Sequence, residues 1–370
     1  MPEALKAGPP PARPPAVRPS FATRVVRWQQ IHGRNDLPWQ NTREPYRVWL
    51  SEIMLQQTQV GTVRGYFARF VARFPDVHAL AAAGEDEVLA LWSGLGYYSR
   101  ARNLHRCAVE VVQRFGGSFP ADATALEALP GIGRSTAAAI ASLCFGARAA
   151  ILDGNVKRVL ARHTGFAQDL AQTAHRQTLW ALAERLLPTR HVQQTMPRYT
   201  QGLMDLGATV CLPARPHCLL CPVNSDCVAR AQGRPKDYPA KTRKPRRGAE
   251  SLWLLLALRE DGAVWLHKRA ARGIWAGLFC LPVFDSAGAL DAAVGGSRVD
   301  DLGLIVHSLT HKDLHLQPRR WQLNARDAQR LERRTDLPGA WQTADAWPRL
   351  GLPAPVRRLL EAQAAPAALA

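Results

Sequence analysis

The feature that most restricts the fold of this chain is a group of four cysteines within 17 residues. They are Cys211, Cys218, Cys221 and Cys227, in the order C-x6-C-x2-C-x5-C. We find no secretory signal, and in a chain without one such a group binds metal more often than it forms disulfides. The other cysteines are predicted to be buried and inert, because each lies singly in an apolar segment: Cys107, Cys144 and Cys280.

Hydrophobic patterning divides the 370 residues into five parts. We predict a flexible proline-rich tail (1–20), a mostly helical domain (21–235), a basic linker (236–250), an α+β domain (251–348) and a C-terminal alanine-rich helix or tail (349–370). No stretch provides the about 20 apolar residues that a membrane span requires. The basic linker is equally consistent with a solvated spacer and with a DNA contact.

The strand predictions begin with an Asp-Gly hairpin signal. Apolar runs at 252–258 and 263–267 flank Glu260-Asp261-Gly262, a sequence typical of a tight turn between antiparallel strands. Further strands are predicted at 278–283, 302–309 and 314–323. An all-helical first part is thus followed by an α+β second part.

The charge balance favours a polyanionic partner. Lys and Arg number 48 against 30 Asp and Glu, which gives a net charge of +18. Nucleic acid is the commonest partner for such a chain. A basic enzyme from a proteome rich in proline and arginine is equally consistent with the composition.

A glycine-containing turn between two helical segments is a candidate phosphate site. Helix–hairpin–helix residues 126–143 include Pro130-Gly131-Ile132-Gly133, followed by Arg134-Ser135. Gly131 and Gly133 allow a tight turn whose N–H groups lie beside the positive end of the next helix, where phosphate binds without base recognition. An ordinary interhelical turn is the alternative.

Two segments supply candidate carboxylates. In Trp49-Leu-Ser-Glu52-Ile-Met-Leu-Gln56-Gln-Thr-Gln59, a continuous helix would place Glu52, Gln56 and Gln59 on one side. Apolar neighbours around Glu52 would raise its pKa towards that of a useful acid. In Leu152-Asp153-Gly154-Asn155, Asp153 or Asn155 would cap the helix that begins near Asn155, and for Asp153 capping would be compatible with a catalytic role. Backbone donors would keep this carboxylate ionised.

A glycine- and tyrosine-rich segment is a candidate DNA wedge. It runs Gly94-Leu95-Gly96-Tyr97-Tyr98, and apolar or aromatic side chains on a flexible loop can enter a base stack. Two ordinary buried tyrosines are the alternative.

These segments together resemble the helix–hairpin–helix DNA repair glycosylases, and the Glu52 segment is most similar to adenine DNA glycosylases of the MutY type. The resemblance covers residues 21–348 and implies a two-lobed all-α glycosylase domain with a [4Fe–4S] lobe, plus a C-terminal Nudix-like α+β domain. It implies catalytic roles for Glu52, Asp153, Asn155 and Ser135. It also implies that the four clustered cysteines hold a [4Fe–4S] cluster.

The same resemblance implies the DNA contacts. These would come from Gln56, Leu95 and Tyr97 at the mispair, from Gly131 and Gly133 at a phosphate, and from Arg215, which is equally consistent with a solvated side chain. In the C-terminal domain, Leu309, Thr310 and His311 align with the family loop that recognises oxidised guanine, where an aromatic residue is common at the position of Leu309. Residues 283–300 contain no glutamate, so Nudix hydrolysis is not expected.

The implied function is hydrolysis of the glycosidic bond of adenine opposite 8-oxoguanine or guanine in double-stranded DNA. We expect a monofunctional enzyme, because Ser135 stands where a lyase of the endonuclease III type has lysine. We also expect a cytoplasmic monomer. The alternatives are an endonuclease III-like pyrimidine-lesion glycosylase and a non-catalytic, metal-containing DNA-binding protein.

Overall fold

The structure is a computed structural model that describes residues 19–40, 42–240 and 247–364. The predicted flexible tail therefore lies outside the described residues, apart from Pro19 and Ser20. Chain contacts divide the protein into two compact units, one containing residues 1–34 and 152–240 and the other residues 35–151 and 241–370. No helix in the described part of the chain is long and apolar enough to cross a membrane.

The first unit is entirely helical. Its elements are α1 (Phe21–His32), α9 (Gly154–Thr164), α10 (Thr173–Arg185), α11 (Val192–Thr209), the 3-10 turns η1 (Cys218–Leu220) and η2 (Asn224–Asp226), α12 (Val228–Ala231) and η3 (Pro235–Asp237). Helices α1 and α9 both pack on α11. The fully buried Asp205 of α11 accepts hydrogen bonds from Arg34 Nε at 2.8 Å and Arg34 N at 3.1 Å. This ion pair fixes the chain just beyond α1.

The second unit begins with the other predicted helices. They are α2 (Pro45–Leu55), α3 (Val60–Arg73), α4 (Val77–Ala82), α5 (Glu85–Trp92), α6 (Ser99–Phe115), α7 (Ala123–Glu127) and α8 (Arg134–Phe145). Their common core includes the fully buried Trp49, Phe70 and Trp92. The helical prediction for this part of the chain is confirmed.

The rest of the second unit is an α+β domain. Its elements are β1 (Gly248–Arg259), β2 (Val264–Lys268), β3 (Phe279–Cys280), β4 (Val283–Phe284), α13 (Ala287–Val294), β5 (Asp300–Asp301), β6 (Ile305–Ser308), β7 (Lys312–Leu323), α14 (Ala325–Glu332), β8 (Ala340–Gln342), η4 (Trp347–Arg349) and α15 (Ala354–Ala364). The order of the sheet is β3-β2-β1-β7-β5, with β1 parallel to β7 and antiparallel to β2.

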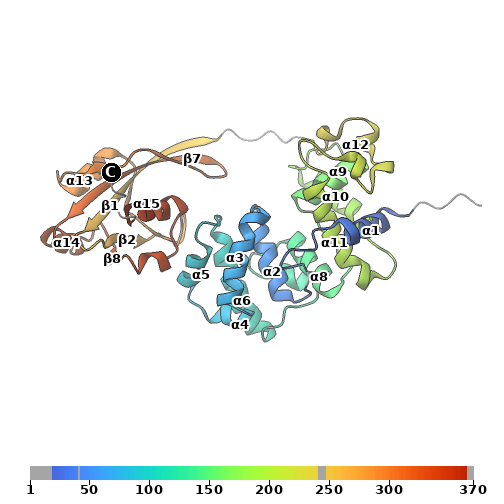
Figure 1. Cartoon of the computed structure of the whole chain (residues 1–370), viewed down its shortest axis with the longest axis horizontal. Coiled ribbons are helices and arrows are strands. Elements are labelled where there is room, and N and C mark those ends of the chain that lie inside the picture. Colours follow the sequence, from blue (N-terminus) through green and yellow to red (C-terminus); the bar gives the residue numbers. More distant parts are fainter. Residues whose placement is uncertain (1–18, 41, 241–246, 365–370) are drawn as a thin grey trace, which may run out of the picture. The chain divides into compact units, whose positions relative to one another are not determined.

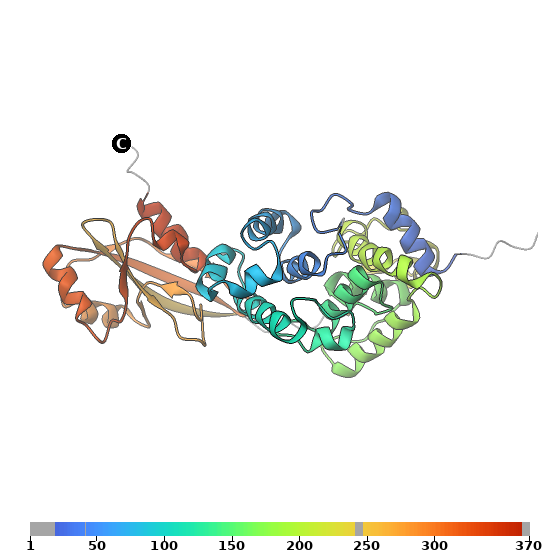
Figure 2. The same cartoon turned by 90° about the horizontal axis from the view of Figure 1, so that it is seen from below.

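Helices cover both faces of this sheet. Successive side chains of a strand point to opposite faces, so Leu254 and Leu256 pack with α15 while Leu255 and Ala257 pack with α13 and α14. Figure 1 shows α15 on one side of the sheet and the other two helices on the opposite side, and Figure 2 shows the same domain from below. The C-terminal helix α15 therefore belongs to the domain core. The predicted domain boundary at residue 348 had placed this helix outside the domain.

The hairpin prediction is confirmed, and two other strand predictions need correction. Leu258 pairs with Val264 across the turn, where Gly262 has a φ of 80°. The predicted strand 278–283 is divided at Pro282, because proline cannot donate to a ladder: β3 pairs with β2, whereas β4 pairs with β1. The predicted strand 302–309 is shorter, because Gly303 adopts a left-handed φ of 82° before β6.

The predicted basic linker is shorter than 236–250. Residues 235–237 form η3, and β1 already begins at Gly248, in parallel register with Lys312. Between them, residues 241–246 lie outside the described residues.

The core position of α15 can be tested with Leu360→Ala. Leu360 is 3% exposed among the side chains on one face of the sheet. Removing a buried leucine side chain costs about 2–5 kcal/mol of unfolding free energy. Denaturant unfolding should show this loss, whereas Glu361→Ala, on the exposed side of the same helix, should be nearly neutral. Equal, small effects of the two changes would mean that α15 does not contribute to the core.

Candidate active site

Glu52 lies in the last turn of α2, a helix fixed at its N-terminal end. Glu44 accepts hydrogen bonds from the backbone N–H groups of Tyr46 and Arg47, both at 2.8 Å, and Pro45 occupies the first helical position. Glu52 itself is partly buried between the buried residues Ser51 and Ile53. Helix α2 packs on α8, where burial, Glu44 and Glu52 raise the pKa of Cys144 to about 12. The charge of Glu52 thus acts on Cys144 across the contact between α2 and α8.

The predicted polar stripe Glu52–Gln56–Gln59 does not exist, because α2 ends at Leu55. Gln56 caps the helix and donates from Nε2 to Thr136 Oγ1 at 3.4 Å. Gln59 begins the next helix, α3. The exposed Gln57, which we did not single out from the sequence, has a left-handed φ of 58°. Adjacent glutamines in the sequence gave no sign of which one faces solvent.

Asp153 is the N-cap of α9, as one of the two sequence interpretations predicted. Its Oδ1 accepts a hydrogen bond from Val156 N at 2.8 Å. Burial raises the pKa of Asp153 above its ordinary value, against the opposing effects of the Val156 and Asn155 N–H groups and of Arg158 and Lys157. The effect of burial on the Asp153 pKa therefore exceeds that of the backbone N–H groups. The sequence analysis had expected these donors to keep the carboxylate ionised.

Asn155 is linked to the cysteine segment through Arg158. Arg158 Nη2 donates to Asn155 Oδ1 and to the Gly207 carbonyl, both at 2.7 Å, and its Nε donates to the Cys211 carbonyl at 2.7 Å. A Cβ atom at Gly207 would lie 2.6 Å from Asn155 Cβ, so α11 approaches the start of α9 closely. One cation therefore holds three segments together next to Asp153.

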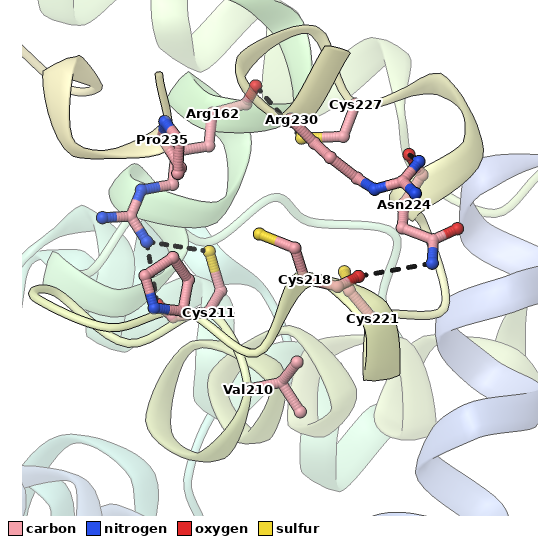
Figure 3. A pocket seen from close by; sticks show the side chains of 10 residues that line it. Arg162, Val210, Cys211, Cys218, Cys221, Asn224, Cys227, Arg230 and Pro235 are labelled. Carbon is pink, nitrogen blue, oxygen red and sulfur yellow. Dashed lines mark hydrogen bonds between the residues drawn. The ribbon is translucent and has the colours of Figure 1, made fainter. Parts of the chain in front are cut away.

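The four clustered cysteines line one cavity of about 30 Å³ (Figure 3). Burial and the neighbouring thiols of Cys211, Cys227 and Cys218 raise the pKa of Cys221 to about 12. The buried Arg162 donates from Nη1 to Cys211 Sγ at 3.4 Å, while its own carbonyl accepts from Cys227 Sγ at 3.4 Å. Among the described residues, no group of three or more His, Cys, Asp or Glu side chains is arranged to hold a metal ion. Arg215, in the first loop of the segment, is exposed.

The helix–hairpin–helix turn has the predicted geometry. Leu129 and Ile132 are buried, while Gly131 and Gly133 are exposed, and Gly133 is the N-cap of α8. Gly131 has a φ of 77°, and a Cβ atom there would lie 2.7 Å from Asn103 Cβ. Ser135 lies in the first turn of α8.

The glycine- and tyrosine-rich loop presents one of its two predicted wedge residues. Tyr97 is 44% exposed with a φ of 50°, whereas Leu95 is only 5% exposed and belongs to the helical core. Leu95 therefore does not face solvent, contrary to the prediction. Gly94 has a φ of 96°, and a Cβ atom there would lie 2.4 Å from the Tyr66 hydroxyl oxygen. The loop conformation requires glycine at this position.

A cavity of about 230 Å³ adjoins this loop. It is lined by Ile53, Gln56, Gln57, Tyr97, Ser99, Arg100, Asn103, Leu104, Pro130 and Gly131. The end of α2, the tyrosine loop and the hairpin turn thus border one hollow.

The predicted loop of the α+β domain lies next to the tyrosine loop. Leu309 N donates to the Lys312 carbonyl at 2.8 Å, which closes a turn at the exposed Thr310 and His311. The Thr310 and Tyr97 hydroxyl oxygens are 3.2 Å apart. Leu309 is partly buried against the core of its own domain. In the same domain, Asp291 of α13 is paired with Arg319, at 2.5 Å.

The matching family models place the chain in a class of DNA repair proteins. Residues 50–185 match the HhH-GPD superfamily base excision DNA repair proteins, and residues 253–362 match the NUDIX domain. Among curated relatives, an adenine DNA glycosylase of Buchnera aphidicola is 35% identical over 346 residues, which cover 92% of this chain and 97% of that protein. The chain therefore belongs to the adenine DNA glycosylase family of base excision repair, and its substrate is DNA.

Other similarities agree with this membership. The human adenine DNA glycosylase is 44% identical over 221 residues, which cover 57% of this chain and 39% of that protein. A solved thermostable thymine-DNA glycosylase is 29% identical with a TM-score of 0.50, over 57% of this chain and 95% of that one.

Asp153→Asn should abolish excision and leave the fold as stable as before or more stable. Asparagine is an equally good N-cap. Because burial raises the Asp153 pKa, the ionised carboxylate is unfavourable in the folded state at any pH above that raised value. Thermal unfolding at neutral pH, together with excision assays, checks both effects.

Asp205→Asn is the matched control in the same unit. Asp205 is fully buried and paired with Arg34, so losing its charge should remove about 1.5–3 kcal/mol of unfolding free energy. A comparable loss for Asp153→Asn would show that the Asp153 charge stabilises the fold.

Proposed function

We propose that this glycosylase removes adenine opposite 8-oxoguanine, and adenine opposite guanine, and leaves an intact backbone at the abasic site. The observation that carries the proposal is the contact between the Tyr97 and Thr310 hydroxyls, 3.2 Å apart. It joins the proposed wedge to the loop proposed to recognise oxidised guanine, so both would act at the base opposite adenine.

Glu52 is the proposed general acid. It would donate a proton to N7 of an adenine flipped out of the duplex, which makes the base a better leaving group. Glu52 lies partly buried in the last turn of α2, between the buried Ser51 and Ile53, where solvent is partly excluded.

Asp153 is the proposed stabiliser of the cationic sugar. An ionised carboxylate would oppose the positive charge that develops as the base departs, as one of the paired carboxylates does in glycoside hydrolysis. Asn155, held by Arg158, and Ser135, in the first turn of α8, would position water or the sugar.

The remaining proposed DNA contacts come from both units. Exposed N–H groups at Gly131 and Gly133 would bind a phosphate at the positive end of α8. Tyr97 and Gln57 would enter the duplex at the mispair, with Gln57 taking the role that the sequence had suggested for Gln56. His311 and Arg215 are exposed and available for DNA.

The excision assay that tests this proposal compares three duplexes under single-turnover conditions. These contain adenine opposite 8-oxoguanine, adenine opposite guanine, and thymine glycol opposite adenine. We expect excision in that order of rate, with none from the last duplex.

Glu52→Gln should reduce the rate by about 100- to 10,000-fold, because glutamine cannot deliver a proton. Glu44→Gln changes a carboxylate at the other end of the same helix and should leave the rate nearly unchanged. Preference for thymine glycol would overturn the proposal.

The same assay identifies the product. Backbone cleavage by a glycosylase needs an amine that forms a Schiff base, and Ser135 has only a hydroxyl. Strand breaks should therefore require added alkali. Borohydride trapping of the wild-type protein on DNA would contradict the monofunctional assignment.

We also propose that Cys211, Cys218, Cys221 and Cys227 hold a [4Fe–4S] cluster. Four thiols around one cavity fit the ligand set of such a cluster. When bound, it would cross-link residues 211–227. Arg162 Nη1 donates to Cys211 Sγ and would place a positive charge beside that ligand.

Purified protein should contain about four irons and an equal amount of sulfide per chain. Cys218→Ser should reduce both, because it removes a ligand, whereas Cys107→Ala changes a buried cysteine outside the cluster segment and should not. Colorimetric iron and sulfide assays measure the difference. Stoichiometric zinc without iron in protein purified anaerobically would refute the cluster.

A further inference from the structure

A buried arginine occupies the apolar face of α6. Arg100 is 8% exposed, in line with the buried Leu104 and Val111 of the same helix. Burial lowers the pKa of Arg100 to about 10, so the guanidinium remains charged at neutral pH. Every hydrogen bond described for its side chain goes to a backbone carbonyl or a hydroxyl of two other segments.

The first of these segments is the end of α2. Arg100 Nη1 donates to the carbonyls of Ile53, Met54 and Gln56, at 2.9, 2.8 and 2.7 Å. The last carbonyls of a helix have no partner within it and form the negative end of the helix dipole. Arg100 therefore caps, from another helix, the turn that contains Glu52.

The second segment is the tyrosine loop. Arg100 Nη2 donates to the Gly96 carbonyl at 3.1 Å and approaches the Leu95 carbonyl at 3.4 Å. The guanidinium also lies 5.2 Å from the Trp92 ring centre and 5.5 Å from that of Tyr97. The same group that caps α2 thus also fixes the backbone of the proposed wedge.

The two exposed side chains next to these contacts both have unfavourable backbone conformations. Gln57 and Tyr97 have φ values of 58° and 50°, in the left-handed region that non-glycine residues seldom adopt. Such conformations persist where surrounding contacts enforce them. Arg100 bonds to the carbonyl on the N-terminal side of each residue, those of Gln56 and Gly96.

We propose that Arg100 is a positioning residue for adenine excision, which holds Gln57 and Tyr97 in fixed register with the end of the helix that carries Glu52. The inference rests on the DNA-contacting roles proposed above for these two side chains. Lysine cannot replace this arginine, because its ammonium group has three donors and lacks the planar fork that spans both segments.

The test compares Arg100→Lys with wild-type holoenzyme on two duplexes under single-turnover conditions. One contains adenine opposite 8-oxoguanine, and the other contains adenine opposite a tetrahydrofuran abasic analogue, where no base opposes the wedge. Arg106→Lys, an exposed arginine of the same helix, is the control.

Arg100→Lys should slow excision by about 10- to 100-fold on the first duplex, because small misplacements of positioning groups have effects of this size. On the second duplex the rate should stay within about threefold of wild type, and the shape of the pH–rate profile should be unchanged. The control should match wild type on both. Equal losses on the two duplexes, or no loss on the first, would overturn the proposal.

Further variants separate this inference from the function on which it rests. Gln57→Ala combined with Arg100→Lys should be no slower than Arg100→Lys alone, since the two residues act together, whereas multiplied losses would count against the coupling. If Gln57→Ala and Tyr97→Ser both excise at the wild-type rate, the proposed DNA contacts fail. If those two are slow and Arg100→Lys is not, only the positioning role fails.

If Arg100→Lys does not fold, Trp92→Phe is the alternative variant. It removes the indole N–H that donates to the Gly96 carbonyl at 3.1 Å, and it should produce the same substrate pattern.

Discussion

Hydrogen bonds from arginine guanidiniums to backbone carbonyls join separate segments within each of the two units. Arg100 joins the end of α2 to the tyrosine loop. In the other unit, Arg158 joins α9 to the Gly207 and Cys211 carbonyls, and Arg162 binds the Leu212 and Pro213 carbonyls at 2.7 and 2.9 Å. Each guanidinium has several donors in one plane, so a single side chain can satisfy carbonyls from separate segments. The groups proposed to act in catalysis and DNA binding occupy helix ends and loops, and these arginines bond to the backbone next to several of them.

Two carboxylates of the first unit, Asp205 and Asp153, differ in whether their charge stabilises the fold. Asp205 is paired with Arg34, and its charge serves the fold. Asp153 is a helix cap whose charged form is disfavoured by burial, so its charge does not serve the fold. An asparagine would cap the helix equally well. A carboxylate in such a place fits the proposed stabilisation of a cationic sugar by Asp153.

The α+β domain matches the NUDIX domain but has no glutamate in residues 283–300. The match covers residues 253–362, and Asp291 of α13 is bound to Arg319. The domain instead contributes Thr310 to a contact with Tyr97. Ser93 Oγ and the Tyr98 hydroxyl both donate to the Leu352 carbonyl, at 2.9 and 2.8 Å, so further hydrogen bonds join this domain to the helices that precede it in the same unit.

The sequence alone determined the family, the helical and α+β parts and the hairpin, because these depend on local motifs and on short-range periodicity. The same motifs predicted Glu52 and Asp153 as catalytic carboxylates, a role that stays a proposal. The sequence also contained a sign of the buried arginine, since Arg100 interrupts the apolar stripe of α6. Only the tertiary structure decided where α2 ends, that Gln57 and not Gln56 is exposed, that Leu95 is buried, and that α15 completes a core. Each of these depends on contacts between segments far apart in the chain, such as the bonds from Arg100 to α2, and no local pattern contains them.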